Sequence, residues 1–187
     1  MGPGLIVAAV IVLLVLIWVI ANYNGLVRLT NLCDESWSDI DTELRRRYDL
    51  IPNLVNTVKG YAAHERDTFT QVIEARNKAF DNHGSPKSQA QDENMLVSAL
   101  RQIFALAEGY PELKASTNFL ELQEQLTHTE DRIQRARRFY NANVRELNTK
   151  AEVFPSNLIA SVFKFSRREF FEIEDAAVRQ VPHVDLQ

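Results

Sequence analysis

One cysteine in 187 residues, Cys33, excludes an internal disulfide and a zinc site built from cysteines. Glycine and proline are scarce, at six residues each, and segments with the alternating pattern of β-strands are almost absent. The net charge of −4 gives no overall attraction for nucleic acid. These absences predict an all-α protein that does not bind nucleic acid, and the lone cysteine is compatible with a reducing compartment.

Motifs for catalysis and cofactor binding are missing as well. None of the histidines, which are His64, His83, His128 and His183, has a histidine or cysteine three or four positions away, as helical metal ligands require. The chain has no glycine-rich phosphate loop, no nucleophile elbow and no Glu-x-x-His pattern of a di-iron bundle. We therefore expect no enzyme activity, no cofactor, no metal and no small-molecule substrate.

A run of seventeen uncharged residues, Leu5 to Ala21, opens the chain. As a helix it spans about 26 Å, close to the roughly 30 Å of a bilayer core. Trp18 and Tyr23 suit the interfacial belt at its downstream end. We predict that residues 1–24 are a single-pass membrane anchor and that the lipid bilayer is a partner. The expected spanning residues are Leu5, Ile6, Val7, Leu13, Leu14, Leu16, Ile17, Trp18 and Ile20.

Two alternatives exist for this run. A signal peptide cleaved after Ala21 has small residues at the right spacing, but no Lys or Arg precedes the run, which exceeds the usual apolar length of about 7–15 residues. A buried core helix is disfavoured because the segment is apolar on every face. Arg28 is the only basic residue within about fifteen positions downstream, so the positive-inside rule slightly favours a cytoplasmic domain.

Helical periodicity dominates the rest of the chain. Apolar residues at steps of three and four predict a helix from about Gly25 to Ala62, kinked but not broken at Pro52. A second helix should end near Asp81, a third should run from about Asp92 to Gly109, and a fourth from Phe119 to Pro155. We predict an antiparallel four-helix bundle over residues 25–154, with a long coiled coil as the alternative.

The last predicted segment, residues 155–187, is amphipathic and ends in a tail. Short connections favour antiparallel neighbours, so the fourth helix should return this segment to the membrane-proximal end. Its side chains could lie in the lipid headgroups, or they could fold onto the flank of the bundle and close its core, which we favour because apolar clusters usually complete a core. The possible lipid-facing residues are Phe163, Lys164, Phe165, Arg167, Arg168, Phe170 and Phe171.

Consecutive arginines at 45–47 and 137–138 cannot all face solvent on a helix. We expect Arg47 and Arg137 to pair with carboxylates such as Glu43 or Asp49, or with polar atoms of a neighbouring helix. An anionic partner surface is the alternative.

Several ordered motifs resemble one known family. They include Tyr23 to Val27 and longer runs that contain Trp37, Tyr48, Asp49, Leu50, Ile51, Pro52, Asn53, Leu54, Arg137, Arg138, Phe139, Tyr140, Asn141, Phe154, Pro155, Ser156 and Asn157. From the anchor to about Glu172 the chain resembles bacterial LemA proteins. The resemblance implies a four-helix bundle on an N-terminal membrane helix, with the short N-terminus outside and the bundle in the cytoplasm, and it implies no enzyme activity.

The function that we predict is a membrane-anchored scaffold or interaction module at the inner membrane. Its partner would be a second copy of itself, giving a homo-oligomer, or another membrane protein. The alternative is a lipid-interacting protein that organises or remodels membrane through self-assembly. A membrane enzyme is disfavoured because no nucleophile or ligand constellation is present.

Overall fold

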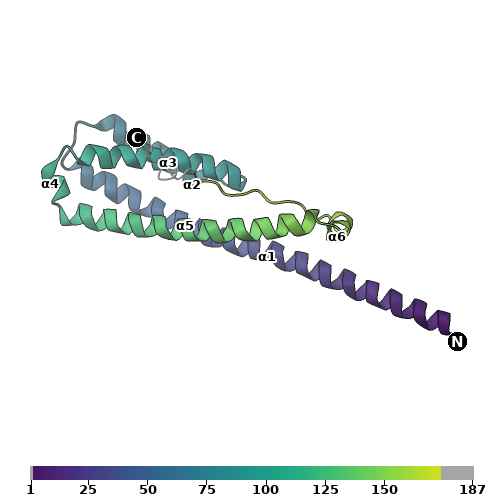
Figure 1. The fold of residues 1–187 in the computed structure, drawn as a ribbon. Helices are drawn as coiled ribbons and strands as arrows, with labels where there is room; N and C mark the ends of the chain where they lie inside the picture. The colour runs from purple at the N-terminus through teal and green to yellow at the C-terminus, as the bar shows by residue number, and fades with distance from the viewer. Residues whose placement is uncertain (1, 174–187) are drawn as a thin grey trace, which may run out of the picture. The chain divides into compact units, whose positions relative to one another are not determined.

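The computed structural model describes residues 2–173 and is helical, with no strand in that range. Its elements are α1 (Pro3–Lys59), α2 (Arg66–Asp81), α3 (Pro86–Ala107), α4 (Pro111–Lys114), α5 (Thr117–Glu152) and α6 (Ser156–Val162) (Figure 1). The predicted all-α class is confirmed. The tail from residue 174, including His183, lies outside the described residues.

Helix α1 is continuous from the apolar run into the polar part of the chain. The expected start of a separate helix at Gly25 is therefore wrong. Polar side chains near this point bond to their own helix, as when Asn22 donates to the Trp18 carbonyl at 2.9 Å and Thr30 donates to the Leu26 carbonyl at 3.0 Å. The helix also continues through Pro52 and ends at Lys59, so the expectation of no break at this proline is confirmed.

The apolar run at the start of α1 is exposed in the structure. Its side chains from Leu5 to Ile17 are about half exposed or more, and none of the most apolar window is buried by protein. The alternative of a buried core helix is therefore wrong. The segment is long and apolar enough to span a membrane.

Contacts divide the chain into two units. Of the described residues, the first unit contains 2–43 and 132–170, and the second contains 44–131 together with 171–173. Helices α1 and α5 contribute to both.

In the first unit, α1 and α5 run antiparallel. The Asn143 side chain donates to the Leu32 carbonyl and to the Ser36 hydroxyl, both at 3.3 Å. One turn along, the rings of Trp37 and Tyr140 lie 5.3 Å apart. Further along, the residue numbers of α1 rise while those of α5 fall. There a guanidinium nitrogen of Arg132 lies 3.8 Å from a carboxylate oxygen of Glu43.

In the second unit, α2 and α3 pack against each other. Helix α3 begins at Pro86 rather than near Asp92, because Ser85 caps it by accepting a hydrogen bond from the Ser88 amide at 3.4 Å and proline suits the first helical position. The short helix α4 was not expected. For helix α5 the sequence predicted about 36 residues, from near Phe119 to just before Pro155. The observed helix has 36 residues, so the predicted length is confirmed.

Candidate functional site

A buried polar cluster joins helices in the second unit. Arg47 on α1 donates to Glu93 of α3 and, at 2.8 Å, to Glu130 of α5. The side chain of Arg47 is 2% exposed and that of Glu93 is fully buried. Tyr48 also donates to Glu93, and Gln89 donates to the Glu93 carboxylate at 3.0 Å. A buried charge is tolerated only when it is paired and hydrogen-bonded, and these contacts supply both.

The carboxylates named from the sequence are not the partners of Arg47. Glu43 pairs with Arg132, and Asp49 is exposed. Positions two apart on a helix do not face each other, which keeps Asp49 away from Arg47. The expectation that Arg47 pairs with carboxylates is confirmed, but its partners are Glu93 and Glu130 of neighbouring helices. One arginine thus bridges two carboxylates, the buried one of Glu93 and the partly exposed one of Glu130.

Histidines and acidic side chains do not gather elsewhere. Residues 2–173 hold no group of three or more His, Cys, Asp or Glu side chains placed to bind a metal ion. His128 lies 3.5 Å from Glu124, and both are mostly exposed, as a solvated helix face predicts.

A second cluster, in the first unit, lies where the apolar run ends. We call it the membrane-proximal collar and define it as Tyr23 with residues 153–165. The Tyr23 ring lies 4.8 Å from the ring of Phe163 and 5.7 Å from that of Phe165. The C-terminal segment therefore reaches the membrane-proximal end of the chain, as the antiparallel helices predicted.

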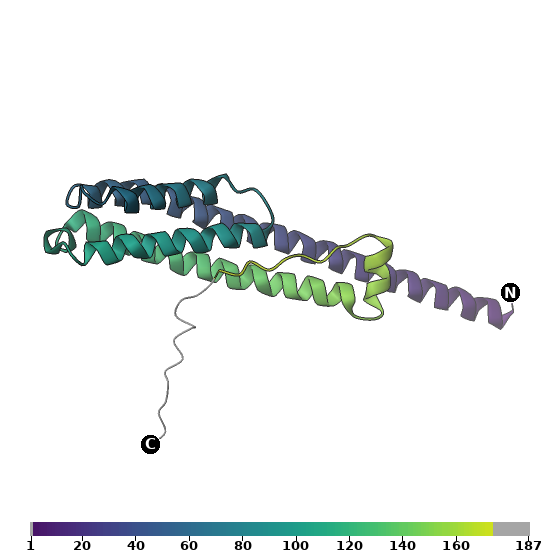
Figure 2. The ribbon, with the colours of Figure 1, turned by 90° about the horizontal axis from the view of Figure 1, so that it is seen from above.

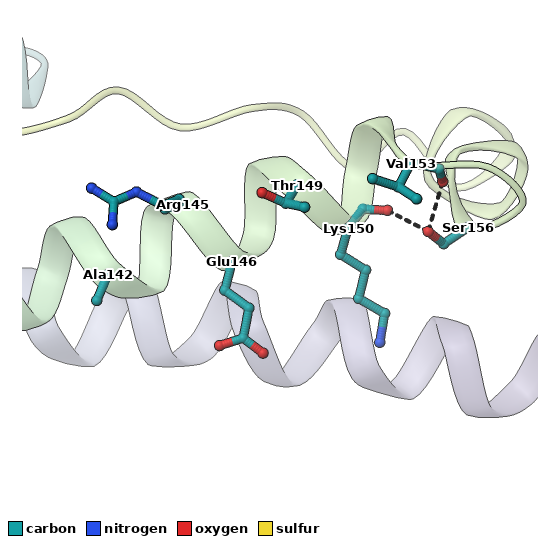
Figure 3. Close-up of a pocket in the computed structure, with 7 residues that line it drawn as sticks. All are labelled: Ala142, Arg145, Glu146, Thr149, Lys150, Val153 and Ser156. Atoms are coloured by element: carbon teal, nitrogen blue, oxygen red, sulfur yellow. Dashed lines mark hydrogen bonds between the residues drawn. The ribbon is translucent and has the colours of Figure 1, made fainter.

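The turn from α5 into α6 is held by Ser156. Its hydroxyl donates to the Lys150 carbonyl at 2.7 Å and lies 2.9 Å from the Val153 carbonyl oxygen (Figure 3). An open hollow of about 550 Å³ follows α5 here, lined by seven residues from Ala142 to Ser156. The Lys150 side chain extends from it toward α1, where its ammonium group lies against Gly25.

The end of α6 turns the chain back. Lys164 has a φ of 60°, and it is the only non-glycine residue with positive φ among residues 2–173. The Phe165 amide donates to the Ala160 carbonyl at 2.9 Å, and the Lys164 amide donates to the Ser161 carbonyl at 3.3 Å. This pair of bonds is a Schellman motif, which ends a helix with one left-handed residue. The reversal places Phe163 and Phe165 on either side of that residue, both against Tyr23.

The two faces of α6 differ in burial. Ser156, Ile159 and Ala160 are buried, with the three- and four-residue spacing of one helix face. Leu158 and Val162 point away and are 54% and 72% exposed. The helix therefore presents an apolar surface that residues 2–173 do not cover.

After α6 the chain runs back along α5 as an extended strap, residues 165–170. Asn148 accepts from the Arg168 amide at 2.9 Å and donates to the Arg168 carbonyl at 3.0 Å. Tyr140, which precedes Asn148 by two turns, donates to the Glu169 carbonyl at 2.9 Å. The strap is thus bonded to the flank of α5, as the favoured alternative for this segment expected.

Several residues considered as lipid-facing are engaged by the protein itself. Arg167 pairs with Glu152 at 2.8 Å, and Arg168 pairs with Asp34 at 2.5 Å. Phe171 is fully buried in the second unit, so the expectation that it faces lipid is wrong. Phe165 and Phe170 are half-buried, whereas Phe163 and Lys164 are exposed.

Burial changes the acidity of two groups in the first unit. Desolvation raises the pKa of Tyr140 to about 12, although Arg168 opposes the rise. Desolvation also raises the pKa of the Cys33 thiol, again against the effect of Arg168. A buried thiol that keeps its proton is a poor nucleophile, so Cys33 is a core residue.

The acidity of Tyr140 predicts a loss of stability at high pH. The unfolded tyrosine loses its proton near pH 10, while the folded one keeps it until about pH 12. Between these values the unfolded state binds fewer protons, so the free energy of unfolding should fall as the pH rises through this window. Absorbance at 295 nm should show the ionisation of Tyr140 near pH 12, and Tyr140→Phe should remove this step. Retention of the step in the variant would contradict the assignment.

The motif residues of the sequence analysis fall into two groups. Tyr48, Ile51, Leu54, Tyr140 and Ser156 are buried and support the helices or the α5–α6 turn, whereas Phe139 and Phe154 are exposed. Sequence reasoning missed the polar residues that complete the sites, which are Gln89, Glu93, Asn143 and Asn148. One signal for Glu93 was present, because it precedes Leu96, Leu100 and Ile103 at helical spacing and so occupies the apolar face of α3.

Comparisons with known proteins identify one family and several relatives. The model of the LemA family matches residues 36–186. Magnetosome proteins MamQ 1 and MamQ 2 of Paramagnetospirillum magneticum are each 24% identical over 180 residues, covering 83% of this chain and 66% of the relative. Protein LemA of Metamycoplasma hominis is 23% identical over 168 residues, covering 86% of this chain and 77% of the relative. The chain spans about two thirds of the length of the MamQ relatives. None of these names denotes an enzyme.

Proposed function

The chain belongs to the LemA family, and from this membership we propose that it is a membrane-anchored, non-enzymatic scaffold or interaction module of the bacterial inner membrane. The observation that carries the proposal is α1, whose exposed apolar run continues without a break into a polar helical body. Membrane association by one helix leaves the body free to meet partners held in the same plane.

We further propose that α1, α2, α3 and α5 form an antiparallel four-helix bundle. Support comes from the second unit, where Arg47 of α1 contacts α3 and α5, and the Tyr48 hydroxyl of α1 lies 3.3 Å from the Ala79 carbonyl oxygen of α2. For orientation we propose an outside N-terminus and a cytoplasmic body, since Arg28 follows the apolar run.

Self-association or contact with another membrane protein is the proposed use of the body. Anchors confined to one plane meet at high effective concentration, which favours such contacts. Phe139 is an exposed aromatic residue on α5 within a motif of the family resemblance, and it is our candidate for the contact surface.

Site-specific photo-crosslinking in native membranes tests this function. A photoreactive residue at Phe139 of the full chain should give a discrete adduct with a second copy or with one membrane protein. The control places it at Glu124, an exposed acidic residue of the same helix. Adducts at neither position, or equal adducts at both, would contradict the scaffold role. Release of the chain by alkaline carbonate would contradict the anchor.

Membrane organisation is the second candidate function. It is favoured by the exposed apolar surface of α6 and its neighbours in the membrane-proximal collar. The magnetosome names of the MamQ relatives describe those proteins and not this chain. They are compatible with a role of this chain at a membrane.

A further inference from the structure

The membrane-proximal collar concentrates exposed apolar side chains. Ten large apolar residues are exposed in the described chain beyond Asn24, and five of them lie between Val153 and Phe163. The other five are scattered singly, which is normal for a protein surface. A concentration of exposed apolar side chains in one short segment indicates a contact surface, and its position indicates the partner.

The collar lies at the level where the apolar run ends. Tyr23 follows Ala21 by two residues, about 3 Å along the helix. Because Phe163 and Phe165 both pack on the Tyr23 ring, the end of α6 sits at the boundary between the hydrocarbon and the headgroups once α1 spans a bilayer. Tyrosine is enriched at that boundary because its ring is amphipathic.

Helix α6 lies across the direction of α5 and α1 in the first unit. Figure 1 shows α6 nearly end-on, and Figure 2, turned by 90°, shows it side-on and crosswise to α5. An element perpendicular to a membrane-spanning helix lies parallel to the membrane plane. Short helices in this plane bury their apolar face about 5–10 Å into the boundary between headgroups and acyl chains.

We propose that α6 is an interfacial helix, whose Leu158 and Val162 insert into the leaflet that surrounds the end of the α1 anchor. The inner face of the helix, formed by Ile159 and Ala160, is buried against protein, so the outer face is the one left for lipid. The inference rests on the proposed function, because it requires α1 to be in a bilayer.

Charge around the collar fits lipid headgroups. Lys164 is exposed at the chain reversal that ends α6, and it makes no ion pair with any residue from 2 to 173. At the interface its ammonium group can meet lipid phosphates. Arg167 and Arg168 are already paired with Glu152 and Asp34, so they hold the strap in place while Lys164 faces the headgroups.

Depth measurement on the full chain tests the proposal. A nitroxide is attached at Val162→Cys in a Cys33→Ala background, and the protein is placed in nanodiscs of phosphatidylcholine and phosphatidylglycerol. Leu120→Cys on α5 is the matched control, because Leu120 is also apolar and is 51% exposed. Val12→Cys marks the anchor. Accessibility to oxygen, which concentrates in lipid, is compared with accessibility to a water-soluble nickel complex.

The expected depth at position 162 is about 5–10 Å below the phosphates, with position 120 in water and position 12 deep in the bilayer. A label at 162 that the nickel complex reaches as readily as the label at 120 would overturn the interfacial helix. Shielding of 162 from both reagents would also overturn it, by showing protein contact instead. A label at 12 in water would instead overturn the anchor and with it the proposed function. Leu158→Cys repeats the test on the same face if Val162→Cys does not fold.

Discussion

Replacing Arg47 with alanine is expected to lower the free energy of unfolding by about 3–5 kcal/mol. The fully buried Glu93 would lose its cationic partner, while Glu130 would lose a bond of 2.8 Å. Glu93 would keep its hydrogen bonds from Tyr48 and Gln89 but would have no counter-charge. The buried carboxylate would then stay charged at a high desolvation cost or take up a proton, and both outcomes cost stability. Chemical denaturation of the full chain in detergent micelles, followed by circular dichroism, measures the loss.

Two variants bracket this prediction. Arg46→Ala removes the neighbouring arginine, which is exposed, and should change the free energy of unfolding by no more than about 0.5 kcal/mol. Arg47→Leu combined with Glu93→Leu removes both buried charges and should recover most of the loss, because an apolar pair can replace a buried ion pair. A double variant as unstable as the single one would contradict the account of an unpaired charge.

Replacing Phe171 with alanine is expected to cost about 3–5 kcal/mol, the range for a large aromatic residue in a core. Phe171 is fully buried although it lies in a segment without regular structure. The lost side chain would leave a cavity that its surroundings fill only in part. Thermal unfolding in micelles should show the loss, at about 2–4 °C per kcal/mol for a chain of this size.

The matched control is Leu120→Ala, which removes an exposed apolar side chain from α5 and should have little effect. Hydrogen exchange separates global from local loss. We expect the amides of residues 165–170 to exchange faster in Phe171→Ala, because the variant weakens the burial of the residue that directly follows the strap. Unchanged protection together with unchanged stability would show that the segment contributes nothing to the core.

Long periodic elements could be predicted from the sequence, and short or aperiodic ones could not. Helix α5 keeps one apolar stripe over ten turns, so its extent was predicted closely. Helix α3 begins before the expected Asp92 because Ser85 caps it and Pro86 occupies its first position, a start signal that apolar periodicity does not contain. Helix α6 has two turns, too few to show a period.

The buried polar cluster could not be predicted without the three-dimensional structure. The run of three arginines at 45–47 predicted that Arg47 points inward, but its partner Glu93 is 46 residues away. No local spacing joins such positions. The strap is another case, because its bonds run from Asn148 and Tyr140 side chains to backbone atoms, and a backbone partner leaves no trace in the sequence.

The uninterrupted course of α1 has a mechanical consequence. A chain with a flexible joint at the membrane surface would let its body swivel independently of the anchor. Here no joint separates the two within α1, and the aromatic rings on Tyr23 brace the helix at that level. A thinner or thicker bilayer tilts a spanning helix to match its apolar length. When α1 spans a bilayer as proposed, such a tilt is shared by the polar residues that continue the same helix in the first unit.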